Sequence, residues 1–258
     1  METVLKTRDL IIDADHILFL VAHSKSYDSG FDEILESDDD WGEDAKIDMK
    51  PYKEHFKAIV RDYELTAEVE SICYGWKLGK TRVIISDDTN FRYDLYPEYK
   101  ASRTEKSEVL SKLKKWAKKK YQCEPNTEAD DVVAYYVRKG GVGVTTDKDL
   151  LYGVAGIWYN SHFKHKSWIR TNKKDALYFF KCQSLAGDTV DEIPALPRVG
   201  LATARKLLKK YGEKWSDILR VYKDYGFDKE YMVMNTRLVC MTQWSPKKGI
   251  KLWEFPNE

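Results

Sequence analysis

Three apolar runs along the chain each end in acidic residues. They are LIIDAD (10–15), TRVIISDD (81–88) and VGVTTDKD (142–149). A short continuous apolar run of this kind predicts a buried strand. Helical spacing of apolar positions appears over 51–79 and 127–141, and AGIWYNS and KSWIRT are further short strands. Strands that alternate with helices predict an α/β fold with a mostly parallel sheet flanked by helices.

The helix over 127–141 has clear boundary signals. Thr127 is its expected N-cap, acids fill its first turn, and Gly140–Gly141 ends it. The segment 90–121 is polar, aromatic and basic, and its latter part has helical spacing. From Asp175 onward the pattern is helical, interrupted by a turn rich in proline and glycine. The second half of the chain is therefore expected to be mostly helical.

Composition narrows the class of protein. The chain has 258 residues, of which 43% are hydrophobic and 33% charged, so a packed core is expected. The net charge of +1 argues weakly against a general nucleic-acid binder, but acids gather in 28–46 and lysines in 112–120. The four cysteines form no CxxC pair, which disfavours a structural zinc site and a disulfide framework and fits a reducing cytoplasm. No signal peptide opens the chain, and the first apolar run is too short and too acidic to cross a membrane.

Acidic residues gather where a parallel sheet would bring them together. The carboxyl ends of parallel strands form one rim, where ligands bind. The acids at strand ends and helix starts are Asp13, Asp87, Glu128, Asp130, Asp131, Asp147, Asp149, Asp188 and Asp191. Each motif alone could be a solvated acid or a helix-dipole partner. Together they need positive charge, and a pair of Mg²⁺ or Mn²⁺ ions would supply it and support phosphodiester hydrolysis. Asp15 and Asp88 compete with Asp13 and Asp87, which lie closer to their strands.

Basic residues complement this acidic rim. Lys100 and Arg103 in YPEYKASR lie three positions apart, so on a helix they could clamp a phosphate, or simply be solvated. The segment 112–121 places Lys115 and Lys119 near Trp116 and Tyr121, which suits phosphate contact with base stacking, unless Trp116 packs inward.

The segment 187–212 has the pattern of a helix-hairpin-helix element, although a plain helical hairpin would share part of it. Such an element grips the DNA backbone without reading sequence. Its second helix is expected to start near Leu201, where free backbone N–H groups can take a phosphate. The expected DNA-binding residues are Val199, Gly200, Leu201, Arg205, Lys206, Lys209 and Lys210.

These motifs together resemble the flap endonuclease / 5′→3′ exonuclease family, which includes bacteriophage 5′ nucleases and the N-terminal nuclease domain of bacterial DNA polymerase I. The strands ending at Asp13 and Asp87, then YPEYKASR, TEADDVVA, TTDKDL and AGDTVDEIPALPRVGLATA, follow the family's order. The resemblance implies a PIN-like nuclease domain in 1–180 with a helical arch in 90–121. It also implies a helical region in 181–258, with a helix-3-turn-helix element in 187–212.

The resemblance also implies the chemistry. It implies hydrolysis at 5′ ends and 5′ flaps of branched DNA, or of RNA-primed DNA, in replication and repair. Asp13, Asp87, Glu128 and Asp130 match the first metal group, and Asp131, Asp147, Asp149, Asp188 and Asp191 match the second. Lys100 and Arg103 match the basic pair at the arch base, and K⁺ could bind backbone carbonyls near Val199–Leu201. Two Mg²⁺ ions, replaceable by Mn²⁺, are the implied cofactors.

Two features depart from the family pattern. Glu192 stands where an Asn is usual, and the acidic insertion 28–46 has no family counterpart. The chain length suggests a stand-alone phage-type enzyme, expected to be a monomer in the host cytoplasm. Replication proteins are candidate partners, but the sequence does not identify one. The alternatives are a PIN-like single-strand ribonuclease, which would not need the hairpin, and a non-catalytic DNA-binding scaffold, which would be expected to lack carboxylates. The C-terminal aromatics Trp244, Trp253 and Phe255 are expected to pack on the core rather than form a docking tail.

Overall fold

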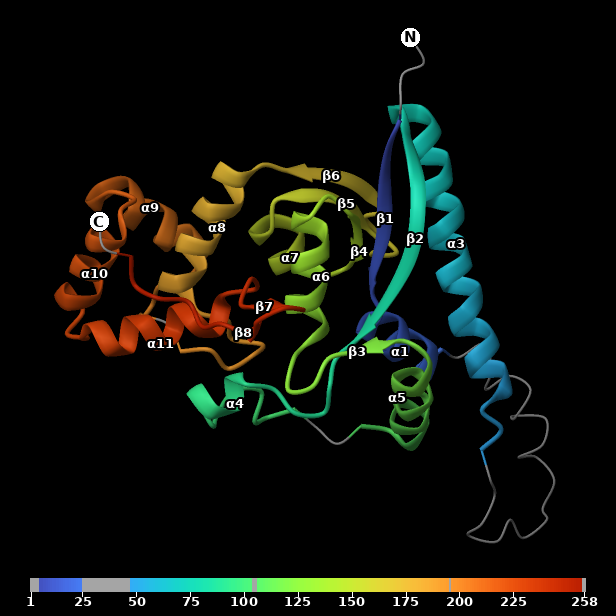
Figure 1. Cartoon of the computed structure of the whole chain (residues 1–258). Coiled ribbons are helices and arrows are strands. Elements are labelled where there is room, and N and C mark those ends of the chain that lie inside the picture. The colour runs from blue at the N-terminus through green and yellow to red at the C-terminus, as the bar shows by residue number, and fades with distance from the viewer. Residues whose placement is uncertain (1–4, 25–46, 104–105, 195, 257–258) are drawn as a thin grey trace, which may run out of the picture.

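The computed structural model describes residues 5–24, 47–103, 106–194 and 196–256 (Figure 1). The acidic insertion 28–46 lies outside these residues. Among the described helices, none is both long enough and apolar enough to cross a membrane.

Within the described residues, six strands form one sheet in the order β3-β2-β1-β4-β5-β6. The strands are β1 (Lys6–Asp13), β2 (Trp76–Ile85), β3 (Gln122–Cys123), β4 (Val142–Thr145), β5 (Gly156–Asn160) and β6 (Ser167–Thr171). Neighbouring strands are parallel except β6, which runs antiparallel to β5. The expected mostly parallel α/β sheet is confirmed.

Helices cover both faces of this sheet. The elements are α1 (Asp15–Ala22), α3 (Lys50–Tyr74), α5 (Glu108–Lys120), α6 (Ala129–Arg138) and α7 (Lys148–Gly153). Leu10 and Ile12 of β1 pack with Phe56 of α3 on one face, whereas Ile11 packs with Val133 of α6 on the other. Burial on both faces explains the continuous apolar run at the start of the chain.

Three predicted boundaries were wrong. The helix expected over 51–79 ends at Tyr74, because Gly75 takes a left-handed conformation (φ 64°) that closes it. β2 then begins at Trp76, five residues before the expected strand, and pairs with β1 from Lys6 onward. The N-cap residue of α6 is Glu128 rather than Thr127, whose hydroxyl instead donates to the Pro125 carbonyl at 2.9 Å.

The C-terminal region is mainly helical and lies to one side of the sheet (Figure 1). It holds α8 (Lys173–Ala186), α9 (Leu201–Tyr211), α10 (Trp215–Asp224), α11 (Lys229–Val239) and the short pair β7 (Trp244–Ser245) and β8 (Gly249–Ile250). Trp253 and Phe255 pack against the cluster of α8–α11, and Trp244 is buried beside α6, so the packing expected for these aromatics is confirmed. The expected division at 180/181 falls inside α8, so the two regions share this helix.

Candidate active site

The carboxyl ends of β1, β2 and β4 meet at one cavity of about 970 Å³. It also receives the starts of α6 and α7 and the loop after α8. The acids that line it are Asp13, Asp15, Asp87, Asp88, Glu128, Asp130, Asp147, Asp149, Asp188 and Asp191. Every predicted metal ligand except Asp131 therefore faces this cavity, as a parallel sheet requires.

One group of carboxylates, Asp13, Asp130 and Asp147, has no ion pair with a lysine or arginine among the described residues. Asp13 is 5% exposed and accepts hydrogen bonds from Thr145 Oγ1 at 2.8 Å and from the Asp15 backbone at 3.2 Å. Burial, together with Asp13 and Asp147, raises the pKa of Asp130 well above its usual range. Burial and the neighbouring Asp149 raise the pKa of Asp147 to about 7. Carboxylates this close disfavour each other's ionisation, so the group needs a cation.

A second group surrounds Lys148. Its ammonium lies 2.9 Å from Asp188 Oδ2 and 3.4 Å from Asp149 Oδ1. Asp188 Oδ1 also accepts the backbone N–H of Val190 at 2.8 Å. Asp149 Oδ1 is buried and accepts no hydrogen bond from the described residues. Burial raises the pKa of Asp149 despite the opposing charge of Lys148, so this oxygen is a strong candidate for a cation ligand.

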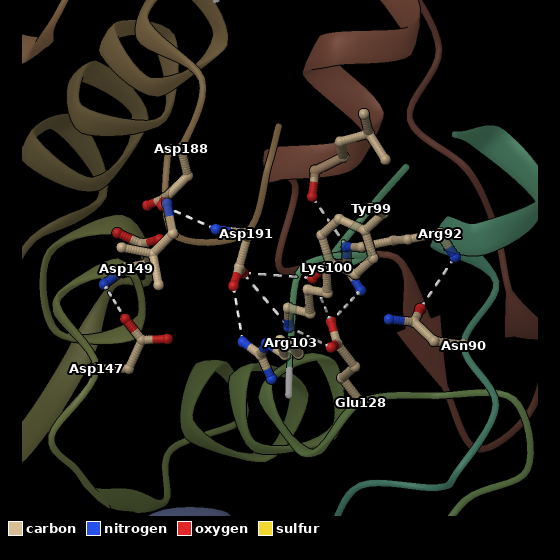
Figure 2. A network of polar contacts seen from close by, with 12 residues as sticks. Asn90, Arg92, Tyr99, Lys100, Arg103, Glu128, Asp147, Asp149, Asp188 and Asp191 are labelled. Carbon is tan, nitrogen blue, oxygen red and sulfur yellow. Dashed lines mark hydrogen bonds and ion pairs between the residues drawn. The ribbon is translucent and has the colours of Figure 1, made fainter. Parts of the chain in front are cut away.

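Lys100 and Arg103 approach the cavity from a turn rather than from a helix. Lys100 has a left-handed backbone (φ 55°), so the helix on which the two residues would have shared a face does not form. Its ammonium lies 2.5 Å from Glu128 Oε1 and 3.3 Å from Asp191 Oδ2. Arg103 donates to Asp191 Oδ1 at 2.8 Å, and its side chain is 58% exposed. Figure 2 shows both cations converging on Asp191, so the turn brings the pair together at the cavity.

Asp131 does not belong to the cavity, which corrects its prediction as a metal ligand. Its carboxylate is fully buried and accepts two hydrogen bonds from Arg92, at 2.7 and 3.3 Å. Arg92, in α4 (Arg92–Leu95), also donates to Glu128 at 3.1 Å and to the carbonyls of Leu238 and Cys240. The first turn of α6 sends Glu128 toward the cavity and Asp131 toward this internal arginine.

Two lysines of α5, Lys114 and Lys118, face the acids that follow β2. Lys118 lies 2.6 Å from Asp87 and 2.8 Å from Asp88, and Lys114 lies 3.3 Å from Asp88. Burial alone would raise the pKa of Asp87, but hydrogen bonds from Lys118 and the Asn126 backbone lower it overall. The side chain of Asp87 is 21% exposed and that of Asp88 is 66% exposed, so Asp87 is the more enclosed of the two candidates. Asp15 lines the same cavity as Asp13.

The structure decides between the two roles that the sequence allowed for Trp116 in α5. Lys115 and Lys119 are exposed, as a phosphate-contacting role needs. Trp116 packs inward, with its ring edge-on to Phe56 at 5.6 Å and to Tyr121 at 5.8 Å. The base-stacking role considered for Trp116 is therefore wrong, and the inward-packing alternative holds.

In the hairpin segment 187–212, the N-terminus of α9 lies next to exposed lysine and arginine residues. α9 begins at Leu201 as expected. Its N-cap is Gly200, which has no side chain to accept the first backbone N–H groups of the helix. Val199 is 4% exposed, so it can offer only backbone atoms. The bases along α9 are all exposed: Arg205, Lys206, Lys209 and Lys210. Glu192 does not line the cavity, and its carboxylate accepts the Ser102 backbone N–H at 2.7 Å, which ties this loop to the turn of Lys100.

The sequence relatives of the chain include a 5′-3′ exonuclease and a DNA polymerase I. No family model matches the chain. The chain is 28% identical over 201 residues to a 5′-3′ exonuclease of Buchnera aphidicola from Acyrthosiphon pisum, covering 69% of this chain and 68% of the relative. It is 32% identical over 146 residues to a DNA polymerase I of Rhizobium leguminosarum, covering 48% of this chain and 14% of that protein.

Solved structures share the fold. A bacteriophage T5 protein D15 co-crystallised with metal ions superposes with a TM-score of 0.61 at 16% identity, covering 91% of this chain and 89% of that chain. The T5 flap endonuclease in a pseudo-enzyme-product complex with DNA and metal ions gives a TM-score of 0.58 at 17% identity, with the same coverage.

The chain is therefore similar to 5′ nucleases in sequence and in fold. The resemblance drawn from the motifs is thereby confirmed.

The cavity carries a donor set that suits hard divalent cations. All the acids that line the cavity offer oxygen ligands, and the buried Asp149 Oδ1 has no hydrogen-bond donor among the described residues. Within the described ranges, however, no three His, Cys, Asp or Glu side chains lie close enough to hold an ion as they stand. The residues therefore fit the group by chemistry, and cation binding requires side-chain movement. At Asp87, Glu128, Asp188 and Asp191 the cation must also displace a lysine.

Sequence reasoning missed several residues of this site. Lys106, Lys114 and Lys148 line the cavity, Lys118 pairs with Asp87, Tyr99 donates to Glu128 at 2.9 Å, and Arg92 holds Asp131. The six-lysine run of 112–120 signalled that α5 is basic, but not which lysines turn inward. Lys148 lies between Asp147 and Asp149, and that position was the available signal for its role.

Proposed function

We propose that the chain is a divalent-metal-dependent, structure-specific 5′ nuclease that hydrolyses phosphodiester bonds at 5′ ends and 5′ flaps of branched DNA. The observation that carries this proposal is the cavity at the strand ends, where crowded carboxylates face Lys100 and Arg103. The names of the sequence relatives support the 5′ nuclease activity, and the DNA and metal ions named for a structural neighbour support the substrate and cofactor. RNA-primed DNA is a second substrate of the proposed enzyme.

The carboxylates would hold two Mg²⁺ ions, for which Mn²⁺ could substitute. When bound, the ions would generate a nucleophile from water and neutralise charge on the phosphodiester. Asp13, Asp87, Glu128 and Asp130 form the proposed first ligand group. The proposed second group is Asp147, Asp149, Asp188 and Asp191, without Asp131.

Lys100 and Arg103 would position and polarise the scissile phosphate. The Lys100 ammonium is held between Glu128 and Asp191, which fixes a buried positive charge at the cavity wall. Arg103 is more exposed and keeps donors available after its bond to Asp191. Fixed cations that face the developing negative charge lower the barrier because they need no reorganisation during the reaction.

The duplex beside the junction would lie along α9. The free N–H groups at the start of α9 and the bases Arg205 and Lys209 suit phosphate contacts that read no sequence. The carbonyls near Val199–Leu201 are the proposed K⁺ site. The segment 90–121, with the exposed Lys115 and Lys119, would form the arch past which the 5′ strand travels.

A cleavage assay tests the function. The chain is incubated with 5′-labelled flap DNA, with a plain DNA strand and with single-stranded RNA, each with Mg²⁺ or EDTA. We expect metal-dependent release of the flap near its junction, with slower cutting of the plain strand. Asp149→Asn should lose cutting but keep flap binding, whereas Asp228→Asn, an exposed helix cap far from the cavity, should retain both. Binding without cutting in Mg²⁺ or Mn²⁺ would favour a scaffold, and cutting of RNA alone would indicate a ribonuclease.

A further inference from the structure

A second cavity of about 720 Å³ lies between α6, α8 and the β7–β8 pair, away from the hairpin. We call it the α6–α8 groove; Figure 1 shows these elements beside one another. Its floor is largely apolar and includes Val154, Leu177, Phe180, Met241 and Trp244. Its rim carries five bases: Arg138, Lys139, Lys173, Lys248 and Lys251. An apolar floor with a basic rim is a chemically specific surface.

The rim charge is largely uncompensated. All five bases are exposed, and none forms an ion pair among the described residues. Lys139 lies over the Tyr135 ring at 5.7 Å, which still leaves its charge facing solvent. The acid that lines the groove, Asp149, is 6% exposed and also lines the nuclease cavity. An anionic ligand therefore matches the rim.

The floor decides which class of anion fits. Trp244 is 6% exposed and meets Tyr135 edge-on at 5.5 Å, and Phe180 meets Trp215 at 5.4 Å, so these rings pack among themselves. Base stacking needs open ring faces, which these packed rings do not offer. Leu177 is 47% exposed and offers contact to an aliphatic or aromatic side chain. A nucleic acid could satisfy the rim but not the floor, whereas an acidic peptide with apolar side chains satisfies both.

We propose that the α6–α8 groove binds an acidic peptide segment of a partner protein. One or two apolar side chains of the segment lie on the floor near Leu177, and its carboxylates pair with two lysines of the rim, Lys173 on α8 and Lys251 after β8. A cavity of this volume holds a few side chains, which suits a short linear segment rather than a folded domain. The duplex surface on α9 stays free, so this interaction would be compatible with DNA binding.

The test uses fluorescence anisotropy with the full chain and labelled probes. The probes are a short aspartate-rich peptide with a central Leu-Phe pair, the same peptide with Ser-Ser at the centre, its asparagine analogue, and a single-stranded DNA of equal charge. We expect the first peptide to bind, and both altered peptides to bind on the order of tenfold more weakly. Lys173→Glu with Lys251→Glu, and separately Leu177→Asp, should weaken the first peptide to a similar extent. Lys57→Glu, an exposed base on α3, should not.

Each outcome decides the proposal. Flap cleavage by each variant shows that it is folded and separates this test from that of the nuclease activity. No binding of the Leu-Phe peptide, or equal binding by the wild type and the groove variants, would overturn the proposal. So would equal binding of the Ser-Ser peptide, because the floor would then contribute nothing. Single-stranded DNA that displaces the peptide and loses affinity in the same variants would reassign the groove to nucleic acid.

Discussion

Replacing Asp147 with Asn should stabilise the metal-free protein at alkaline pH. A carboxyl whose pKa rises from 3.8 to about 7 on folding opposes folding by up to about 4 kcal/mol once it is ionised, at about 1.4 kcal/mol per tenfold change in proton affinity. The side chain keeps some exposure, which screens the charge, so we expect a gain of about 1–3 kcal/mol. Asn also retains the cap, since Asp147 accepts the Asp149 N–H at the start of α7.

The pH dependence gives this prediction its sign. Because the folded-state pKa of Asp147 is raised, this residue does not destabilise the wild type below about pH 4, and it destabilises the fold increasingly as the pH rises through 7. Urea unfolding in EDTA should therefore show little difference between wild type and Asp147→Asn at pH 4, and a more stable variant at pH 8. Adding Mg²⁺ at pH 8 should stabilise the wild type more than the variant, because the variant has lost a ligand charge.

Asp228→Asn provides the matched control. Asp228 caps α11 through the Tyr231 N–H at 2.8 Å and is exposed, so the same substitution should leave stability nearly unchanged at both pH values. If Asp147→Asn gains nothing over wild type between pH 4 and pH 8 in EDTA, the electrostatic crowding inferred for this cavity is wrong.

Three further predictions concern named contacts. Lys100→Ala should lower the single-turnover cleavage rate by about 100- to 1,000-fold with little change in flap affinity, and an unchanged rate would count against its role at the phosphate. Asp131→Asn should reduce the free energy of unfolding by about 3 kcal/mol because it leaves a buried Arg92 undercompensated, whereas the exposed Asp62→Asn should not; equal urea midpoints would refute this. Arg205→Ala should lower the slope of log affinity for flap DNA against log salt concentration by about one. An unchanged slope would show that Arg205 does not contact the duplex.

The sheet and the rim were predictable because they follow from local pattern. Apolar runs buried on both faces identify parallel strands, and parallel strands must end on one side. The boundary at Gly75 was missed because helical periodicity continues past it in the sequence. The left-handed glycine cap and the pairing of Lys6 with Trp76 ended the helix there, and that pairing joins residues far apart in the chain.

The roles of adjacent acids were harder to predict. Glu128, Asp130 and Asp131 lie within four positions, yet Asp131 turns to Arg92 while the others face the cavity. Nothing local distinguishes them, because the deciding partner comes from α4 and is itself held by carbonyls of the C-terminal region. Similarly, Lys118 faces Asp87 while its neighbour Lys119 faces solvent, and only the packing of α5 on the core sets that direction.

The distribution of lysines indicates where a first cation would bind. Lys100 pairs with Glu128 and Asp191, Lys118 with Asp87, and Lys148 with Asp188, so a cation at any of these acids must displace an ammonium group. Among the described residues, no lysine or arginine forms an ion pair with Asp13, Asp130 or Asp147. An incoming ion would reduce their mutual repulsion without breaking an ion pair, whereas elsewhere the gain is offset by the broken pair. A cation at Asp13 and Asp130 of the proposed first group, or at Asp147 of the second, therefore displaces no ammonium group, whereas a cation at Asp149 and Asp188 must displace Lys148.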